Sequence, residues 1–252
     1  MITDNLAIKN FIIIAHRGES YDAPENTLAS VNLAWEKGAD AVEVDIRMTR
    51  DKKIVVIHDS TTKRTGDKNY KINECLYNDL KNVNVGFING NKYNTETIPS
   101  LADVIKTIPE DRFLLIDIKI GKEIIPYLEN VISSQEHKKK NIIFISEIYG
   151  TLKELKQRNP EIDTYLILEK KWYLLGLNVK QVIKKCRSIR LDGIDIKDGM
   201  YLTKGFIDTI KNAGLKIYTW TVDDPARAKM LFNNGINGIT TNRANWLKGK
   251  LN

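Results

Sequence analysis

The alternation of short β-rich segments with amphipathic helical stretches is the feature that most constrains the fold of this chain. Eight segments rich in Ile, Val, Leu, Tyr and Thr are predicted strands, at 11–15, 41–46, 112–119, 141–146, 164–168, 193–196, 216–221 and 238–241. Apolar residues recur at helical spacing between most of them, over 26–37, 123–134, 150–158, 204–212 and 225–233. Such an alternation is typical of a parallel sheet in which helices connect consecutive strands.

Glycine marks three of the helix-to-strand junctions. Gly38, Gly214 and Gly235 each follow a helical stretch and precede a β-rich segment. Glycine just past a helix can take the left-handed conformation that ends it. No Gly-x-Gly-x-x-Gly pattern follows the first strand, which argues against an open dinucleotide-binding sheet. Eight strands in 252 residues therefore predict an α/β fold, a (β/α)8 or TIM barrel, as a single domain over 1–252.

One segment interrupts the alternation. The residues RDKK separate AVEVDIRMT from IVVIHD, which leaves no room for a helix and predicts an antiparallel hairpin after the second barrel strand. An even-length turn centred on Asp51 and Lys52 would place Asp45 directly opposite His58. Residues 60–98 then form a small polar insertion before helical residues resume at Pro99. A long loop of this kind inside a compact domain is usually functional.

Composition excludes several classes of protein. Apolar residues make up 42% of the chain, which is enough for a sizeable core and excludes a disordered protein. No run approaches the ~18 consecutive apolar residues of a membrane span, and the polar opening segment has no secretory signal pattern. Cys75 and Cys186 match no metal-binding spacing and are expected to be free thiols. We therefore expect a soluble, cytoplasmic protein.

The chain is basic overall, but its basic residues form no concentrated binding surface in the sequence. The net charge of +7 favours association with anions, but the basic residues are spread through the chain, mostly in pairs. Their one triplet, at 138–140, lies between a helical stretch and a strand, and no arginine-rich arm is present. We therefore expect no nucleic-acid partner, and the sequence leaves the oligomeric state open.

Two of the three histidines fall at the ends of predicted strands. His16 follows FIIIA and His58 follows IVVI, and the carboxyl ends of barrel strands carry the active site in TIM-barrel enzymes. Either histidine alone would more simply be structural. However, each is next to an ionic residue, Arg17 in one case and Asp59 in the other. Because histidine titrates near neutral pH, the two could serve as a general acid and a general base.

Carboxylates occupy alternate positions in the second predicted strand. Glu43 and Asp45 leave the same face of that strand, and burying two unpaired carboxylates inside a barrel is costly. Hard oxygen ligands of this kind suit Mg²⁺ or Ca²⁺. Asp117 and Lys119 repeat the spacing in the next parallel strand, so Asp117 could complete a metal site and Lys119 could bind a phosphate oxygen. The alternative is a simple Asp117–Lys119 salt bridge with no cation.

The motifs in their order resemble the glycerophosphodiester phosphodiesterase family. The matching segments are HRGESYDAPENTLAS, GADAVEVDIRMTRDKKIVVIHD, IPSLADVI, LLIDIK and GINGITTN, and they extend from about residue 11 to residue 247. The resemblance implies a TIM barrel with a small inserted subdomain. It also implies hydrolysis of glycerophosphodiesters, such as glycerophosphocholine or glycerophosphoethanolamine, to glycerol 3-phosphate and an alcohol.

The resemblance also implies roles for individual residues. By position in the motifs, the acid/base pair would be His16 and His58, and the metal ligands would be Glu43, Asp45 and Asp117. The residues expected to contact substrate or phosphate are Arg17, Lys119, Glu25, Asn26, Trp220 and Phe87. Of these, Glu25 and Asn26 also open the first helix, where such residues favour capping. Phe87 lies in the insertion, as a pocket wall or as part of that segment's core.

Several positions depart from the pattern of the resembled family. The third metal ligand is usually glutamate in I-E-I-K, whereas this chain has the shorter Asp117. Glu147 stands where relatives often have S-S-F, and Asp195 adds charge at another strand end. The W-T-x-N pattern ends here in Asp223, and the T-D-x-P pattern has Asn242 in place of its aspartate. These departures leave both histidines and the first two predicted ligands in place.

Two alternative functions stay open at this point. Lysophospholipase D-like hydrolysis would keep the chemistry but would require an apolar channel for an acyl chain. A non-catalytic barrel that binds anions or nucleic acid would use the positive charge, and its binding would depend steeply on salt. The presence of both histidines together with the carboxylates argues against the non-catalytic alternative. The sequence does not assign the acid and base roles to one histidine or the other.

Overall fold

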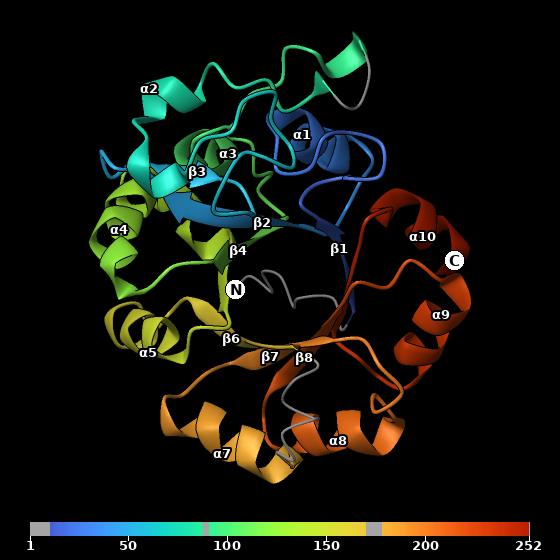
Figure 1. The fold of residues 1–252 in the computed structure, drawn as a ribbon. Coiled ribbons are helices and arrows are strands. Elements are labelled where there is room, and N and C mark those ends of the chain that lie inside the picture. The colour runs from blue at the N-terminus through green and yellow to red at the C-terminus, as the bar shows by residue number, and fades with distance from the viewer. Residues whose placement is uncertain (1–10, 88–90, 170–177, 252) are drawn as a thin grey trace, which may run out of the picture.

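Eight parallel strands form a closed barrel in the computed structural model, which describes residues 11–87, 91–169 and 178–251 (Figure 1). The strands follow one another around the barrel in chain order, and pairing of the first with the second and the last closes it. They are β1 (Ile12–His16), β2 (Ala41–Met48), β4 (Phe113–Ile118), β5 (Ile142–Ser146), β6 (Asp163–Leu168), β7 (Gly193–Lys197), β8 (Lys216–Trp220) and β9 (Gly238–Thr241). The predicted (β/α)8 barrel is confirmed.

Helices surround the barrel on its outer face (Figure 1). They are α1 (Leu28–Glu36), α3 (Leu101–Lys106), α4 (Ile125–Ser133), α5 (Tyr149–Arg158), α7 (Val179–Ser188), α8 (Lys204–Asn212), α9 (Pro225–Asn233) and α10 (Ala244–Leu251). The five predicted helical stretches agree with these bounds to within two residues. α7 and α10 were not predicted, and α3 was predicted only as helical residues that resume at Pro99. In the part of the chain that the structure describes, no helix is long and apolar enough to cross a membrane.

Local chemistry determines where these helices begin and end. Thr27 caps α1 by accepting a hydrogen bond from the Ser30 amide at 3.2 Å, and Asp224 caps α9 through the Arg227 amide at 2.9 Å. The glycines predicted at three junctions all adopt positive φ, between 79° and 83°. Cys75 and Cys186 are both free, as expected.

Alternation along each strand divides the side chains into two sets. In β2, Val42 and Val44 pack against the surrounding helices, whereas Glu43 and Asp45 point into the barrel. The lower interior of the barrel is an apolar layer that includes Ile12, Ile14, Ala41, Leu115, Ile143, Ile145, Tyr165, Ile167 and Tyr218. The polar inward-facing residues therefore lie at the carboxyl ends of the strands, and the apolar layer fills the barrel interior below them.

The predicted hairpin exists, but its register differs from the expected one. β3 (Ile54–Val56) pairs antiparallel with β2. The Ile57 amide donates to the Asp45 carbonyl oxygen at 2.9 Å, so Asp45 lies opposite Ile57 and not opposite His58. The predicted pairing of Asp45 with His58 was therefore wrong by one residue.

The turn of this hairpin explains the difference. The Thr49 amide donates to the Lys53 carbonyl oxygen at 2.9 Å, which leaves three residues in the loop instead of an even number. Lys52, the third of them, adopts a φ of 65°, as the last residue of a three-residue loop does. His58 still reaches the barrel mouth because β3 ends at Val56 and the chain bends at His58.

The insertion over residues 60–98 is a packed unit and not an open loop. Its buried residues, with two from the hairpin, form a separate small core of Val55, Ile57, Ile72, Leu80, Val83, Val85 and Ile98. Among its described residues are α2 (Tyr77–Leu80) and the 3₁₀-helices Ile72–Glu74 and Asn91–Tyr93. In Figure 1 it covers the edge of the barrel near β2, β3 and α1.

Candidate active site

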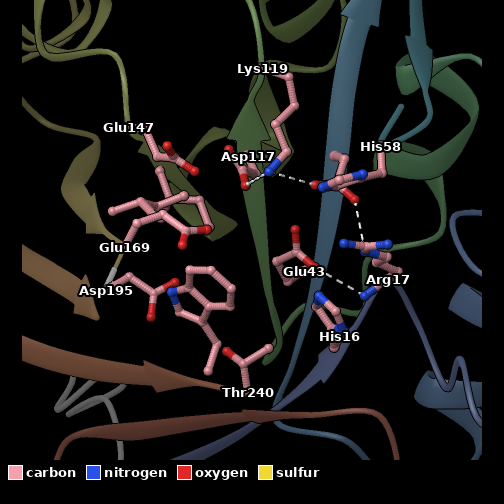
Figure 2. Close-up of a pocket in the computed structure, with 14 residues that line it drawn as sticks. His16, Arg17, Glu43, His58, Asp117, Lys119, Glu147, Glu169, Asp195 and Thr240 are labelled. Carbon is pink, nitrogen blue, oxygen red and sulfur yellow. Dashed lines mark hydrogen bonds and ion pairs between the residues drawn. The ribbon is translucent and has the colours of Figure 1, made fainter. Parts of the chain in front are cut away.

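A small cavity of about 90 Å³ opens at the carboxyl ends of the strands (Figure 2). All the barrel strands or their ends contribute to it, as does the hairpin. The lining residues are His16, Arg17, Glu43, Asp45, His58, Asp117, Lys119, Ile145, Glu147, Ile167, Glu169, Asp195, Trp220 and Thr240. The structure thus brings together both predicted histidines, the three predicted metal ligands, and the predicted Arg17, Lys119 and Trp220.

Three carboxylates form a buried cluster at one side of this cavity. Glu43, Asp45 and Asp117 each offer one oxygen, and these three oxygens lie within 4.8 Å of one another. The parallel register of β2 and β4 produces the cluster because it pairs Asp45 with Asp117. The Lys119 ammonium lies 2.5 Å from Asp117 Oδ2 and 3.1 Å from Asp45 Oδ1. The predicted Asp117–Lys119 salt bridge is therefore also present.

Burial sets the protonation of these carboxylates. Burial, together with the charges of Asp45 and Asp117, raises the pKa of Glu43 well above its usual range. Burial likewise raises the pKa of Asp117 to about 7, although Lys119 opposes the shift. Burial also acts on Asp45, but Lys119 and Arg17 outweigh it and lower the pKa of that carboxyl. Three ionised carboxylates would therefore carry more negative charge than Arg17 and Lys119 compensate.

The donor set of the cluster fits a divalent cation. All three ligand oxygens are hard donors from buried side chains. In addition, Asp117 Oδ1 is buried and has no hydrogen-bond partner among the described residues. A buried oxygen of this kind is costly unless a cation or a donor approaches it.

His16 lies at the end of β1, and a side chain outside the cavity fixes its imidazole. Its Nδ1 is 2.7 Å from Asn242 Oδ1. Burial lowers the pKa of His16 below its ordinary value of 6.5, and the neighbouring Arg17 guanidinium lowers it further. The imidazole is therefore neutral near pH 7, and Nε2 is the nitrogen left to exchange a proton in the cavity.

His58 is held through the same nitrogen by a charged partner. Its Nδ1 lies 2.6 Å from Asp59 Oδ1. Burial raises the pKa of Asp59, but hydrogen bonds from Arg64 and His58 outweigh it and lower the value to about 2. Asp59 is therefore ionised, and because a carboxylate can only accept a hydrogen bond, it fixes the His58 imidazole with the hydrogen on Nδ1.

Arg17 is oriented by a strained turn directly after β1. Its φ of 54° and the φ of 81° at Gly18 turn the chain back towards the barrel mouth. A Cβ at Gly18 would lie 2.5 Å from the backbone of α1, so no other residue fits there. The Arg17 amide donates to Glu43 Oε2 at 3.0 Å and its Nη1 to Glu25 Oε1 at 2.8 Å, while Nε lies 3.1 Å from Asp45 Oδ2.

Asn26 and Glu25 support the site without lining it. Asn26 donates from Nδ2 to Asp45 Oδ2 at 2.8 Å, and its Oδ1 accepts from the Asp45 amide at 3.1 Å. These two bonds fix the Asp45 carboxylate, while Glu25 fixes the Arg17 guanidinium. The structure therefore places both residues behind the groups that line the cavity, and their predicted substrate contact stays a prediction.

Arg64 is a residue that the sequence analysis missed. From the insertion, its Nη1 and Nη2 both donate to the Glu25 carboxylate at 2.7 Å, and its Nε donates to Asp59 Oδ2 at 2.7 Å. Arg64 thus joins the partner of Arg17 to the partner of His58. Nothing in the segment TTKRTGDK distinguishes Arg64 from the other basic residues around it.

Replacing Arg64 by Gln is expected to lower kcat/KM by about 10- to 100-fold, because both Arg17 and His58 would lose a fixed partner. The measurement is steady-state hydrolysis of a glycerophosphodiester, the substrate class that the sequence resemblance implies. Lys63→Gln is the matched control, because Lys63 is an exposed neighbouring residue and its replacement removes the same positive charge. Equal kcat/KM for the parent and Arg64→Gln would show that the orientation of Arg17 and His58 does not depend on Arg64.

The wall opposite the histidines is acidic (Figure 2). Glu147, Glu169 and Asp195 line it, and burial raises the pKa of Asp195 to about 8. The Lys197 ammonium lies 3.7 Å from Glu169 Oε2 and 5.3 Å from the centre of the Trp220 ring. Glu169 was missed in the sequence, although its position two residues beyond an inward-facing Ile indicates that it faces the cavity.

Phe87 does not line the cavity. Its side chain is 46% exposed at the edge of the insertion, and residues 88–90 after it lie outside the described residues. Its predicted part in substrate binding stays a prediction.

The fold and the cavity together place the groups of a candidate acid–base centre at the mouth of a barrel. Two imidazoles, each held through Nδ1, line one cavity together with a buried carboxylate cluster and two cationic side chains. Cationic side chains at the barrel mouth suit the transfer of an anionic group, such as a phosphoryl group, because they stabilise the negative charge that develops in the transition state.

Comparison with known proteins identifies the family. The family model of the glycerophosphoryl diester phosphodiesterases matches residues 16–245. A glycerophosphodiester phosphodiesterase of Caldanaerobacter subterraneus is 29% identical over 91% of this chain and 93% of its own length. A lysophospholipase D of Rattus norvegicus is 24% identical over 95% of this chain and 85% of its own length.

A solved structure is similar to this chain in both fold and sequence. It is an Oleispira antarctica phosphodiesterase in complex with the product sn-glycerol-3-phosphate. Its TM-score is 0.82 and its sequence is 27% identical, over 95% of this chain and 96% of that one. The chain therefore belongs to the glycerophosphoryl diester phosphodiesterase family and is an enzyme of that class.

Proposed function

We propose that this enzyme hydrolyses small glycerophosphodiesters, such as glycerophosphocholine or glycerophosphoethanolamine, to glycerol 3-phosphate and an alcohol, with Mg²⁺ or Ca²⁺ as cofactor. One observation carries the proposal. His16 and His58, each held through Nδ1, line the same small cavity as the buried carboxylate cluster. The glycerol 3-phosphate bound to the Oleispira antarctica relative supports the choice of product.

Glu43, Asp45 and Asp117 are the residues that would hold the cation. A bound divalent cation would polarise a phosphoryl oxygen and neutralise part of its charge. Asn26 keeps Asp45 in place through two hydrogen bonds, and the Arg17 amide keeps Glu43 in place through one. Both ligands from β2 are thus oriented before substrate arrives.

Arg17 and Lys119 would bind the phosphate oxygens. The Arg17 guanidinium is fixed by Glu25, so little rotamer freedom is lost when it binds an anion. Burial opposes a charged Lys119, but Asp117 and Asp45 outweigh it and raise the pKa of Lys119, which stays charged. Fixed positive groups of this kind stabilise the charge that develops in the transition state.

The two histidines would move protons in opposite directions. Neutral His16 accepts a proton at Nε2 from the attacking oxygen, because burial and Arg17 keep its pKa low. His58, which the Asp59 carboxylate fixes through Nδ1, would donate a proton from Nε2 to the leaving alkoxide. The two imidazoles thus have different partners at Nδ1, a neutral amide oxygen for His16 and a carboxylate for His58.

The acidic wall favours an alcohol that carries a positive charge. Glu147 and Glu169 lie across the cavity from Arg17, so phosphate and alcohol would occupy opposite sides (Figure 2). The Trp220 ring, already near the Lys197 ammonium, can contact a second cation through its face. An ammonium group therefore suits this wall better than a neutral alcohol.

The test is release of glycerol 3-phosphate from glycerophosphocholine and glycerophosphoethanolamine in the presence of Mg²⁺ or Ca²⁺. We expect turnover of both substrates, its loss on addition of EDTA, and its recovery when the cation is restored in excess. Glycerophosphoglycerol, whose alcohol is neutral, serves as the comparison for the acidic wall. The absence of turnover of every glycerophosphodiester with either cation would contradict the proposal.

Lysophospholipid hydrolysis is the second candidate, because the chain is similar to a lysophospholipase D. The cavity is small and mostly charged, and the exposed Phe87 does not extend it. We therefore expect faster hydrolysis of glycerophosphocholine than of lysophosphatidylcholine, and the reverse preference would favour the second candidate.

A further inference from the structure

His16 has a second set of neighbours on the side away from the cavity. Its Nδ1 lies 2.7 Å from Asn242 Oδ1, just after β9. The Asn242 Nδ2 donates to Asp223 Oδ2 at 2.7 Å, and the Asn242 amide donates to Asp223 Oδ1 at 2.8 Å. Asp223 is exposed, so this chain of contacts runs from the protein surface to the imidazole at the cavity.

Only one orientation of the Asn242 side chain satisfies these contacts. A carboxylate can only accept hydrogen bonds, so the NH₂ group must face Asp223 and the amide oxygen must face His16. Thr241 also donates to Asp223, at 2.6 Å, which fixes the carboxylate itself. The amide oxygen in turn can only accept, so it requires a hydrogen on His16 Nδ1.

We propose that Asn242 and Asp223 are positioning residues that hold neutral His16 in the Nδ1–H tautomer, with the Nε2 lone pair directed into the cavity. If the amide were reversed, its NH₂ group would require an unprotonated Nδ1, and Nε2 would carry the hydrogen. His16 could then not accept a proton in the cavity. This inference rests on the proposed function, in which His16 takes the proton from the attacking oxygen.

The proton transfer that results is balanced without involving Asn242. The attacking O–H bond breaks, its proton moves to Nε2, and the imidazolium keeps its Nδ1–H bond to the amide oxygen. The Asn242 amide takes up no proton, and Asp223 remains a carboxylate throughout. Both residues therefore act through His16 and not on substrate.

The two contacting positions are also two of the departures seen in the sequence. Asp223 stands in place of the asparagine of W-T-x-N, and Asn242 stands in place of the aspartate of T-D-x-P. Exchanging both preserves an amide–carboxylate contact, whereas placing aspartate at both positions would bring two carboxylates together. As a result, His16 contacts the neutral amide oxygen of Asn242, and the negative charge lies on Asp223, on the far side of that amide.

The test reads the tautomer directly. Long-range ¹H–¹⁵N correlation spectra of histidine-labelled protein distinguish Nδ1–H from Nε2–H, and a His16→Gln variant assigns the His16 signals. We expect the Nδ1–H pattern in the parent protein. Asp223→Ala should populate the Nε2–H pattern and lower kcat about 10-fold or more, with KM unchanged.

A rescue variant and a control complete the experiment. The double exchange Asp223→Asn with Asn242→Asp should retain the Nδ1–H pattern, because a carboxylate also only accepts. Ser20→Ala removes a longer contact, at 3.3 Å, to the same amide oxygen and should leave the spectrum and kcat unchanged.

Three results would overturn the proposal: an Nε2–H pattern in the parent, a spectrum and kcat unaffected by Asp223→Ala, or loss of the Nδ1–H pattern in the double exchange. The last of these can still be read if the Asp223→Ala protein fails to fold. Because the spectra need no substrate, a failure of the proposed activity would leave the tautomer measurement intact.

Discussion

Replacing His58 by Gln is expected to lower kcat for glycerophosphocholine by about 10²- to 10⁴-fold, with little change in KM. In our proposal His58 donates a proton to the leaving alkoxide, and glutamine cannot do so. Substrate binding depends on Arg17, Lys119 and the carboxylate cluster, which this substitution leaves in place. The measurement is steady-state hydrolysis at saturating cation.

Comparing substrates with different leaving groups tests directly whether His58 is the general acid. p-Nitrophenolate leaves without protonation, so a p-nitrophenyl ester of glycerol phosphate should lose much less activity in His58→Gln than glycerophosphocholine does. His137→Gln is the matched control, because His137 lies in the 3₁₀-helix Glu136–Asn141 at the opposite end of the barrel. Equal losses for the two substrates would show that His58 is not the acid.

Much of this site follows from two regular features of a parallel barrel, the alternation of side chains within a strand and the alignment of neighbouring strands. Alternation within a strand puts Glu43 and Asp45 on one face, and the parallel register of the next strand adds Asp117 beside them. The ends of the strands then locate His16 and the mouth of the barrel. These features are local or repeat regularly, so the predicted fold and the predicted cluster agree with the structure.

The features that were missed depend on contacts that no local pattern encodes. The hairpin register depends on a positive φ at Lys52, and lysine does not mark such a position as glycine would. Arg64 contacts Glu25 across 39 residues of sequence, and only the packing of the insertion against the barrel brings them together. Long-range side-chain contacts of this kind require the three-dimensional structure.

Asp117→Ala is expected to raise the concentration of Mg²⁺ or Ca²⁺ that gives half-maximal activity, while the fold stays intact. Loss of an outer partner of a metal ligand typically costs about 10- to 100-fold in affinity, and loss of a direct ligand should cost at least as much. Titration calorimetry with the cation alone measures the affinity without depending on turnover. Asp208→Ala is the control, since that exposed carboxylate pairs only with Lys204 among the contacts described.

The structure sharpens what the alternative outcome would mean. Asp117 is also the nearest carboxylate to the Lys119 ammonium, at 2.5 Å, so its loss could act on Lys119 alone. Asp117→Glu separates the two roles, because it keeps the charge near Lys119 and lengthens the arm towards the cation. If Asp117→Ala binds the cation and turns over substrate as the parent does, Asp117 serves only as the partner of Lys119. The cation would then depend on Glu43, Asp45 and, across the cavity mouth, Glu147.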